Sequence, residues 1–400
     1  MTAAAVSERL LPEPAPQPQA QWQSLPLQFT GSGSEYFRIW IVNLLLVIVT
    51  LSLYLPYAKA RRLRYFHGNT LVGGHALGFH GQGSKMLRGY ALVLVFAACY
   101  VLAGQFSPLA AGLAGLALVG LWPALWQASL RFRLANTSWR GLRMQFKGSV
   151  GDAYRTLLPS MLPAGAVLLL TGLRGNRQAA SGAAPLIDGL WVDALIGACV
   201  LLLLGAAPWL TARLKRYQHG SYHFAGDTTT LAATTGDFYR LWGRGMGVAL
   251  VPLLLLIGGT SVLIGSGSAP NSPQRVAESN AILAMVLVFY ALLFFGVAPW
   301  FGARLQNLVW GRTASPRLRF ASRLRARDLA WLTLKNLLLT LLTLGMYRPF
   351  AVVATLRLRL AAVSLQSLGP PDGWVASLHA LPGDAAGDAA GDLLGVDLGL

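Results

Sequence analysis

Two groups of polar side chains occupy matching positions near the two ends of the chain, inside otherwise apolar segments. Residues 43–58 align without a gap with residues 336–351. The polar and ionisable positions that could contact a solute are Asn43, Thr50, Tyr54, Lys335, Asn336, Thr343 and Tyr347. Short, interrupted apolar segments in corresponding positions of two halves are typical of a transport site. We therefore predict that the two segments lie against each other and that these residues bind a substrate.

Three of these residues also have a purely structural interpretation. Asn43 and Asn336 could form hydrogen bonds between helices, which stabilise membrane proteins by about 0.6 kcal/mol each. Because duplicated units bury equivalent faces against one another, we expect the two amides to bind each other. Lys335 is a functional candidate if it lies at membrane depth. The alternative is that its long side chain reaches the aqueous interface.

A second group of residues could bind phosphate. Arginines cluster in short loops beside apolar runs, where each contributes about 1 kcal/mol to binding anionic lipid. The candidates for lipid headgroups are Arg61, Arg62, Arg64, Arg88, Arg131, Arg155, Arg213 and Arg216. The formal charge of +18 follows the distribution of a membrane protein, with basic loops on the cytoplasmic side, so we expect no nucleic-acid partner.

Catalytic and metal-binding patterns are weak. His219 and His223 have the i, i+4 spacing of a helical metal site, but neither Glu nor Cys accompanies them. Cys99 and Cys199 each lie inside an apolar run, where cysteine acts as a small apolar residue. The sequence has no phosphate-binding loop with Gly-Lys-Ser/Thr. We predict that the protein is not an enzyme and needs neither metal nor cofactor.

The elements that must position these residues are membrane helices. Apolar residues make up 54% of the chain and charged residues 12%, whereas an ordinary soluble domain has roughly a quarter of charged residues. A span needs about 20 apolar residues. Six runs approach or exceed that length: 89–105, 108–129, 156–173, 190–211, 246–266 and 281–302. The sequence thus predicts an all-α polytopic membrane protein.

Two shorter runs, 39–56 and 329–347, flank the six. They could cross the membrane, or they could enter and return on the cytoplasmic side. The re-entrant alternative keeps both termini in the cytoplasm and leaves only Arg174, Arg177 and Arg275 outside, in agreement with the charge rule. Re-entrant backbone requires protein or a water-filled cavity to bind its polar groups.

The chain also resembles itself. The spacing of Pro56, Arg64, Gly74, Phe79 and Gly81 returns at Pro123, Arg131, Gly141, Phe146 and Gly148, and returns in part from Pro208 and from Pro299. Such self-similarity indicates internal repeats. We predict a disordered tail at 1–26, a repeat-built transmembrane domain at 27–366 and an acidic low-complexity tail at 367–400.

Three stretches carry a resemblance to a known family. They are the segment from Thr343 to Ala351, its partner from Thr50 to Lys59, and the region from Arg64 to Gly81. They resemble the YjgN-like bacterial inner-membrane family over roughly 27–366, with Ser52 where that family usually has Gly. The family is a domain of unknown function, so the resemblance implies a location in the inner membrane and no activity.

Two function classes remain open. The protein is expected to be a transporter or channel for an unknown solute, with the matched segments at its centre. Alternatively, it is a structural or regulatory membrane protein that binds anionic lipid or partner proteins through its basic loops. The sequence does not indicate an oligomeric state. A polar cavity joining Asn43 to Asn336 would favour the first class, and a dry contact would favour the second.

Overall fold

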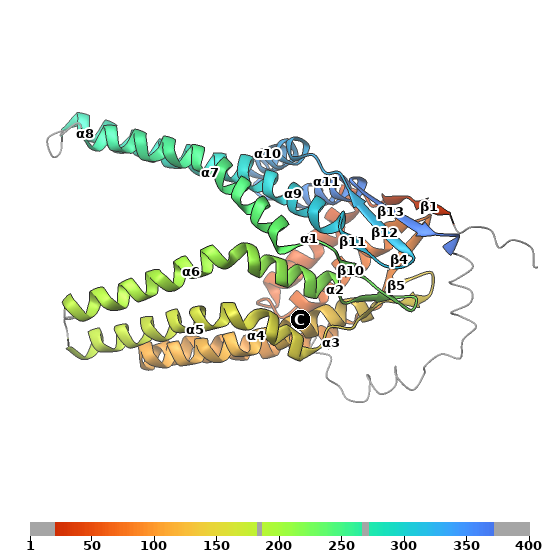
Figure 1. Ribbon diagram of the computed structural model, residues 1–400, viewed down its shortest axis with the longest axis horizontal. Coiled ribbons are helices and arrows are strands. Elements are labelled where there is room, and N and C mark those ends of the chain that lie inside the picture. The colour runs from red at the N-terminus through yellow and green to blue at the C-terminus, as the bar shows by residue number, and fades with distance from the viewer. Residues whose placement is uncertain (1–20, 182–185, 266–271, 372–400) are drawn as a thin grey trace, which may run out of the picture.

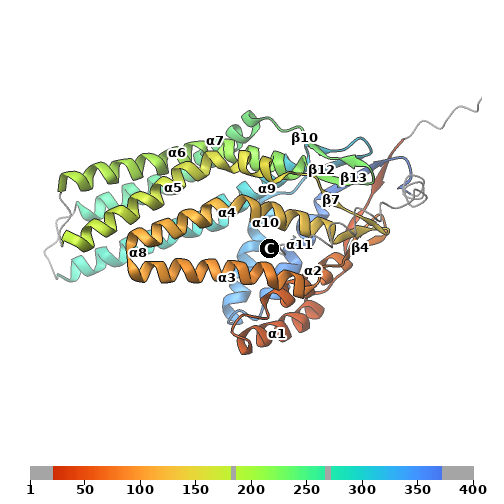
Figure 2. The same cartoon turned by 90° about the horizontal axis from the view of Figure 1, so that it is seen from below.

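A computed structural model describes residues 21–181, 186–265 and 272–371 of the chain. The fold is mostly helical, but three small β-sheets gather at one end of the molecule (Figure 1). The expected all-α class is therefore wrong in one respect, because the basic loops between the helices contain strands. The far ends of the long helices lie at the opposite end (Figure 2).

Within the described residues, six helical segments confirm the six predicted runs, each being long and apolar enough to cross a membrane. They are α3 (Gly83–Phe106), α4 (Pro108–Ala135), α5 (Val150–Ser181), α6 (Leu186–His219), α7 (Thr235–Ile264) and, as one continuous span, α8 (Pro273–Leu292), the π-helical turn η1 (Leu293–Val297) and α9 (Ala298–Trp310). Helices adjacent in the chain pack side by side as antiparallel pairs. Their apolar side chains are largely exposed on the protein, as expected for helices that contact lipid.

The two shorter predicted runs belong to helical hairpins rather than to single spans. The first hairpin is α1 (Gly33–Val49) and α2 (Leu55–Gly68), and the second is α10 (Ala326–Leu342) and α11 (Arg348–Ala361). Each run contains the end of the first helix and the turn that follows it. Both hairpins begin and end at the sheets, because the strands that flank α1 and α2 pair with each other, as do those that flank α10 and α11. Each hairpin therefore returns to the end from which it started.

The strands are short and antiparallel. They are β1 (Trp22–Leu25), β2 (Leu27–Phe29), β3 (Thr70–Val72), β4 (His75–Phe79), β5 (Thr137–Trp139), β6 (Leu142–Arg143), β7 (Gln145–Phe146), β8 (Tyr222–Phe224), β9 (Asp227–Thr228), β10 (Thr230–Leu231), β11 (Thr313–Ala314), β12 (Leu318–Ser322) and β13 (Val363–Leu368). The sheet orders are β2-β3-β4-β5-β6, β7-β8-β9 and β10-β11-β12-β13-β1.

Single residues join the three sheets into a ring. Pro26 separates β1 from β2, Met144 separates β6 from β7, and Thr229 separates β9 from β10. Each of the three still forms a backbone hydrogen bond to a neighbouring strand or turn, at 2.8–3.0 Å. The described strands thus follow one another in a closed circle, which we call the β-ring.

The two ends of the described chain meet in the β-ring. Strand β1 pairs with β13, with Trp22 opposite Leu368 and Leu25 opposite Leu365. Residues 22–25 were assigned to the disordered tail from the sequence, and this part of the assignment is wrong because they form a sheet. Residues 367 and 368, assigned to the acidic tail, also belong to a sheet, as the end of β13. Residues 1–20 and 372–400 of the two predicted tails lie outside the described residues.

The helices close in the same circular order as the strands. Helix α1 packs against α11, so that the first and last hairpins are neighbours. The rings of Phe37 and Phe350 lie 5.8 Å apart across this contact, and Arg357 Nη2 donates to the Gly31 carbonyl at 2.9 Å. Within the β-ring, Leu25, Val72, Trp139 and Leu365 form a buried core that draws on strands from both ends of the chain.

Candidate functional site

The two predicted Asn residues are buried but do not bind each other. Asn43 Oδ1 accepts from Arg61 Nη1 at 3.3 Å, within the first hairpin. Asn336 Nδ2 donates to the Ala351 carbonyl and to Thr355 Oγ1, each at 3.3 Å, within the second hairpin. The predicted Asn43–Asn336 contact is therefore wrong, because each amide finds a partner on the returning helix of its own hairpin.

The predicted threonines and tyrosines organise the hairpin turns. Thr50 Oγ1 donates to the Leu46 carbonyl at 2.7 Å and accepts from the backbone of Tyr54 at 3.0 Å. Thr343 Oγ1 repeats this with Leu339 at 2.7 Å and Tyr347 at 2.9 Å.

The seventh predicted substrate residue, Lys335, is exposed on α10. Of the predicted substrate residues, only Asn43 lines a pocket that the first and last hairpins share.

That pocket is a cavity of about 530 Å³ between α1, α2, α3 and α11. We call it the basic pocket, because three cations line it: Lys59 and Arg62 from α2, and Arg348 from α11. Its other lining residues are polar or apolar: Tyr36, Trp40, Asn43, Leu44, Val47, Leu55, Pro56, Ala58, Met86, Tyr90, Pro349 and Val352. No carboxylate is among these lining residues. The cavity therefore combines a positive field with an apolar wall.

Electrostatics within the basic pocket agree with this composition. Burial lowers the pKa of Lys59, and the charge of Arg133 lowers that pKa further. Burial also raises the pKa of Tyr36, while the charges of Arg62 and Arg348 act in the opposite direction. Tyr36 thus keeps its phenolic proton at neutral pH and can donate a hydrogen bond. Crowded cations without a nearby carboxylate are stabilised by an anionic ligand.

The predicted lipid-binding arginines divide into two groups. Arg62 lines the basic pocket, and Arg64, Arg88 and Arg131 are exposed at the sheet end of α2, α3 and α4. The others have partners inside the protein. These partners are Asn43 and the Tyr54 hydroxyl for Arg61, Asp152 for Arg155, the Arg155 carbonyl for Arg213, and Thr235 Oγ1 for Arg216.

Sequence reasoning missed Lys59 and Arg348 as ligand-binding candidates. Lys59 lies three residues after Pro56, and Arg348 directly precedes Pro349, so both lie beside prolines that the alignment of 43–58 with 336–351 already matched. The missing information was which faces of α2 and α11 meet.

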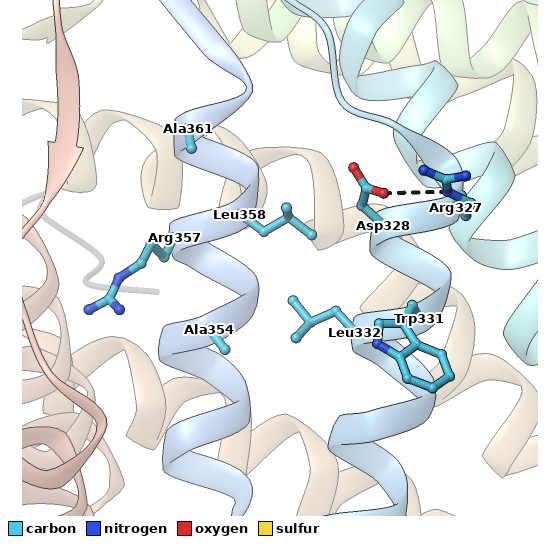
Figure 3. Close-up of a pocket in the computed structure, with 8 residues that line it drawn as sticks. All are labelled: Arg327, Asp328, Trp331, Leu332, Ala354, Arg357, Leu358 and Ala361. Carbon is cyan, nitrogen blue, oxygen red and sulfur yellow. Dashed lines mark ion pairs between the residues drawn. The ribbon is translucent and has the colours of Figure 1, made fainter.

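A larger, open groove of about 760 Å³ lies between α10 and α11 (Figure 3). Leu332 and Leu358 point toward each other across it, whereas Arg357 points away from α10. The one carboxylate in its lining, Asp328, forms an ion pair with Arg327 at 3.8 Å. This groove presents mainly apolar surface and has no group of convergent polar atoms.

The two histidines with helical spacing do not converge on one point. The ring of His219 is buried against Trp310 and lies 3.4 Å from Thr313 Oγ1, and His223 contacts Thr228 Oγ1 at 3.0 Å. Across the described ranges, no group of three or more His, Cys, Asp or Glu side chains could hold a metal ion.

These features define a polytopic membrane protein with six spans, two helical hairpins and a β-ring. The chain belongs to a family described as bacterial protein of unknown function (DUF898), whose model matches residues 24–393. It is 24% identical over 342 residues to an inner membrane protein, YjgN, of Salmonella typhimurium strain LT2, covering 81% of this chain and 84% of the relative. It is 33% identical over 124 residues to the protein of that name from Escherichia coli O157:H7, covering 30% and 31%.

No solved structure matches the chain. Together with the six candidate spans, these relatives place it as a multi-pass protein of the inner membrane, in contact with the lipid bilayer. Their descriptions name no activity.

Proposed function

We propose that the protein binds the headgroup of an anionic membrane lipid in the basic pocket and thereby acts as a structural or regulatory component of the inner membrane. The observation that carries this proposal is the convergence of Lys59, Arg62 and Arg348 on one cavity without a lining carboxylate. The apolar wall of the same cavity, which includes Leu44 and Val47, suits the glycerol and upper acyl region of a lipid.

The position of the hairpins supports a lipid rather than a soluble anion. The turns carry large apolar side chains that are almost fully exposed, with Leu51 at 88% and Leu344 at 94%. Exposed apolar surface of this kind favours insertion into a bilayer. With the turns in the hydrocarbon layer, the basic pocket on the sheet side of them lies near the headgroups. The hairpins are then re-entrant, and the basic sheet end with both chain ends lies in the cytoplasm.

Internal repetition is also part of the proposal. The five helices that lead into the β-ring each carry a buried proline: Pro56, Pro123, Pro208, Pro299 and Pro349. The residue four positions later is also buried in every case. Three long helical pairs and two short hairpins of one repeated plan account for this pattern.

The lipid proposal is tested by thermal unfolding of the purified protein in detergent, titrated with dihexanoyl phosphatidylglycerol, dihexanoyl phosphatidylcholine or inorganic phosphate. A ligand that binds only the folded state raises Tm, and we expect phosphatidylglycerol to act at the lowest concentration. The double variant Arg62→Gln/Arg348→Gln should weaken its effect at least tenfold, since a hydrogen bond to a charged group contributes about 1.5–3 kcal/mol.

The matched control is Arg327→Gln, because Arg327 is an exposed arginine outside the basic pocket. It should respond to phosphatidylglycerol as the wild type does. An equal response to phosphatidylcholine, or an unchanged response of the double variant, contradicts lipid binding at this site. An equal response to inorganic phosphate means that the pocket binds a soluble anion.

Passage of a solute is the second candidate function. The hydrogen bonds of Asn43 and Asn336 argue against a shared site between them. A different observation favours transport: a second cavity, of about 610 Å³, is lined by all five helices that lead into the β-ring.

A further inference from the structure

The second cavity, which we call the ring chamber, lies inside the β-ring. Strands from all three sheets line it, and so do the sheet-side ends of α2, α4, α6, α9 and α11. Its volume of about 610 Å³ is within the range of small-molecule sites, roughly 300–1,000 Å³. The chamber is separate from the basic pocket, with no lining residue in common.

Corresponding positions on the helices supply polar groups to the ring chamber. Arg133, Gln218 and Arg359 each lie ten residues after the buried proline of their helix, and all three line the chamber. Because these three residues lie at the same distance from the matched proline, they occupy equivalent faces of their helices. The circular order of the helices therefore directs these side chains toward one axis.

The charge of the ring chamber is positive. Arg133 and Arg359 line it, and neither forms an ion pair with a carboxylate in the described part of the chain. The one carboxylate in the lining, Asp227, lies 3.8 Å from Arg317 Nε. Burial raises the pKa of the Tyr222 hydroxyl in the lining to about 12, so this group remains a donor.

Most of the remaining lining is aliphatic, and four large aromatic side chains add to it. Trp139 and Phe224 contribute from β5 and β8, and Trp310 and Phe320 from α9 and β12. An apolar chamber that contains aromatic surface and two guanidinium groups suits a ligand with an apolar ring and a carboxylate, because arginine binds carboxylates in a bidentate manner. We propose that the ring chamber is a binding site for a small organic anion of this class, an aromatic or similarly apolar monocarboxylate.

Photolabelling tests this proposal with 4-azidobenzoate as the probe, on the intact protein in lipid nanodiscs. Label should concentrate in peptides that contain Trp139 or Phe224, and benzoate should protect them while neutral benzamide does not. The double variant Arg133→Gln/Arg359→Gln should reduce labelling of these peptides at least tenfold. The control Arg131→Gln/Arg327→Gln removes two arginines outside the chamber, one of them on the same helix as Arg133, and should label normally.

A second variant keeps the test decisive if the double variant does not fold. Leu134→Trp fills the chamber and retains both arginines, so it should block labelling while Tm stays near that of the wild type. Equal protection by benzamide, label spread over the whole chain, or full labelling of Leu134→Trp overturns the proposal. The basic-pocket variant Arg62→Gln/Arg348→Gln should label as the wild type does, so that failure of the lipid proposal and failure of this one are separate results.

Discussion

The buried Asn of each hairpin forms its hydrogen bonds within that hairpin, although Asn336 Oδ1 has no hydrogen-bond partner among the described residues. An unpaired polar group in an apolar layer is costly, and in each hairpin the returning helix supplies the nearest donor or acceptor for the Asn of the first helix. Arg61 serves Asn43, whereas the Ala351 carbonyl and Thr355 serve Asn336. Because the two amides use different partners, equivalent sequence positions have diverged in chemistry. Arg61 also joins Asn43 to the Tyr54 hydroxyl, so it links the two helices of the hairpin.

One position in the two hairpin turns has the same left-handed backbone conformation but a different residue in each turn. Ser52 has φ +73°, and its counterpart Gly345 has φ +92°. A side chain in this left-handed region costs about 1–2 kcal/mol, whereas glycine adopts it freely. We expect Ser52→Gly to stabilise the protein by about 0.5–1 kcal/mol, after allowing for the greater entropy of glycine in the unfolded chain. Thermal unfolding in detergent measures the change.

The reverse substitution is the control for this backbone effect. A Cβ atom added at Gly345 meets no other atom within 4 Å, so Gly345→Ser changes backbone strain without a steric clash. It should lower stability by about 1 kcal/mol. A loss of stability in Ser52→Gly would show that the hydroxyl of Ser52 matters more than its backbone conformation.

At the scale of elements, long helices were predictable and short strands were not. Each span is a continuous run of apolar residues. Such a run can be recognised from the sequence alone, because a helix that contacts lipid must be apolar along its length. The strands have two to six residues, and several pair with partners distant in sequence, as β1 does with β13. No local pattern specifies such a partner.

The repeated glycines gave a partial signal for these strands. Gly74, Gly141 and Gly226 all have φ between +82° and +85°, and each closes a tight turn between two antiparallel strands. Glycine at such a position is typical of two-residue β-hairpins.

The basic pocket could be predicted only in part, since its cations come from helices whose contact depends on ring closure.

The proposed re-entrance of the hairpins can be tested by labelling. In a background of Cys99→Ala/Cys199→Ala, we expect Leu51→Cys and Leu344→Cys to resist a membrane-impermeant maleimide applied from either face, because the proposal places both side chains in hydrocarbon. Ser24→Cys, exposed on β1, should react in inside-out vesicles only. Reaction of Leu51→Cys in intact cells from the periplasmic face would mean that the first segment crosses the membrane.

At the scale of the whole molecule, the fold is a circle whose two ends must find each other. Helix α1 packs on α11, and β1 pairs with β13, so the last contacts of the ring join residues more than three hundred positions apart. Closing so long a loop costs conformational entropy. The pairing of β1 with β13 is supported by Arg319, whose guanidinium lies 3.9 Å from the centre of the Trp22 ring. The ring chamber and the basic pocket both depend on this closure, because each includes residues from both ends of the chain.

A disulfide across the closing strands tests this dependence. Ser24 pairs with Gln366, and both side chains are exposed. Directly opposed residues of antiparallel strands have Cα atoms about 4.5–5.5 Å apart, within the range of a disulfide. In the cysteine-free background, Ser24→Cys/Gln366→Cys should oxidise readily and raise the free energy of unfolding by about 2–4 kcal/mol. Reductant should reverse this gain.

The control for the disulfide is Ser24→Cys/Ser364→Cys. Its two positions are offset by two residues, about 7–8 Å apart, so this pair should oxidise poorly. Equal oxidation of both pairs would refute the strand register, and oxidation of the first pair without a rise in Tm would show that ring closure does not limit stability.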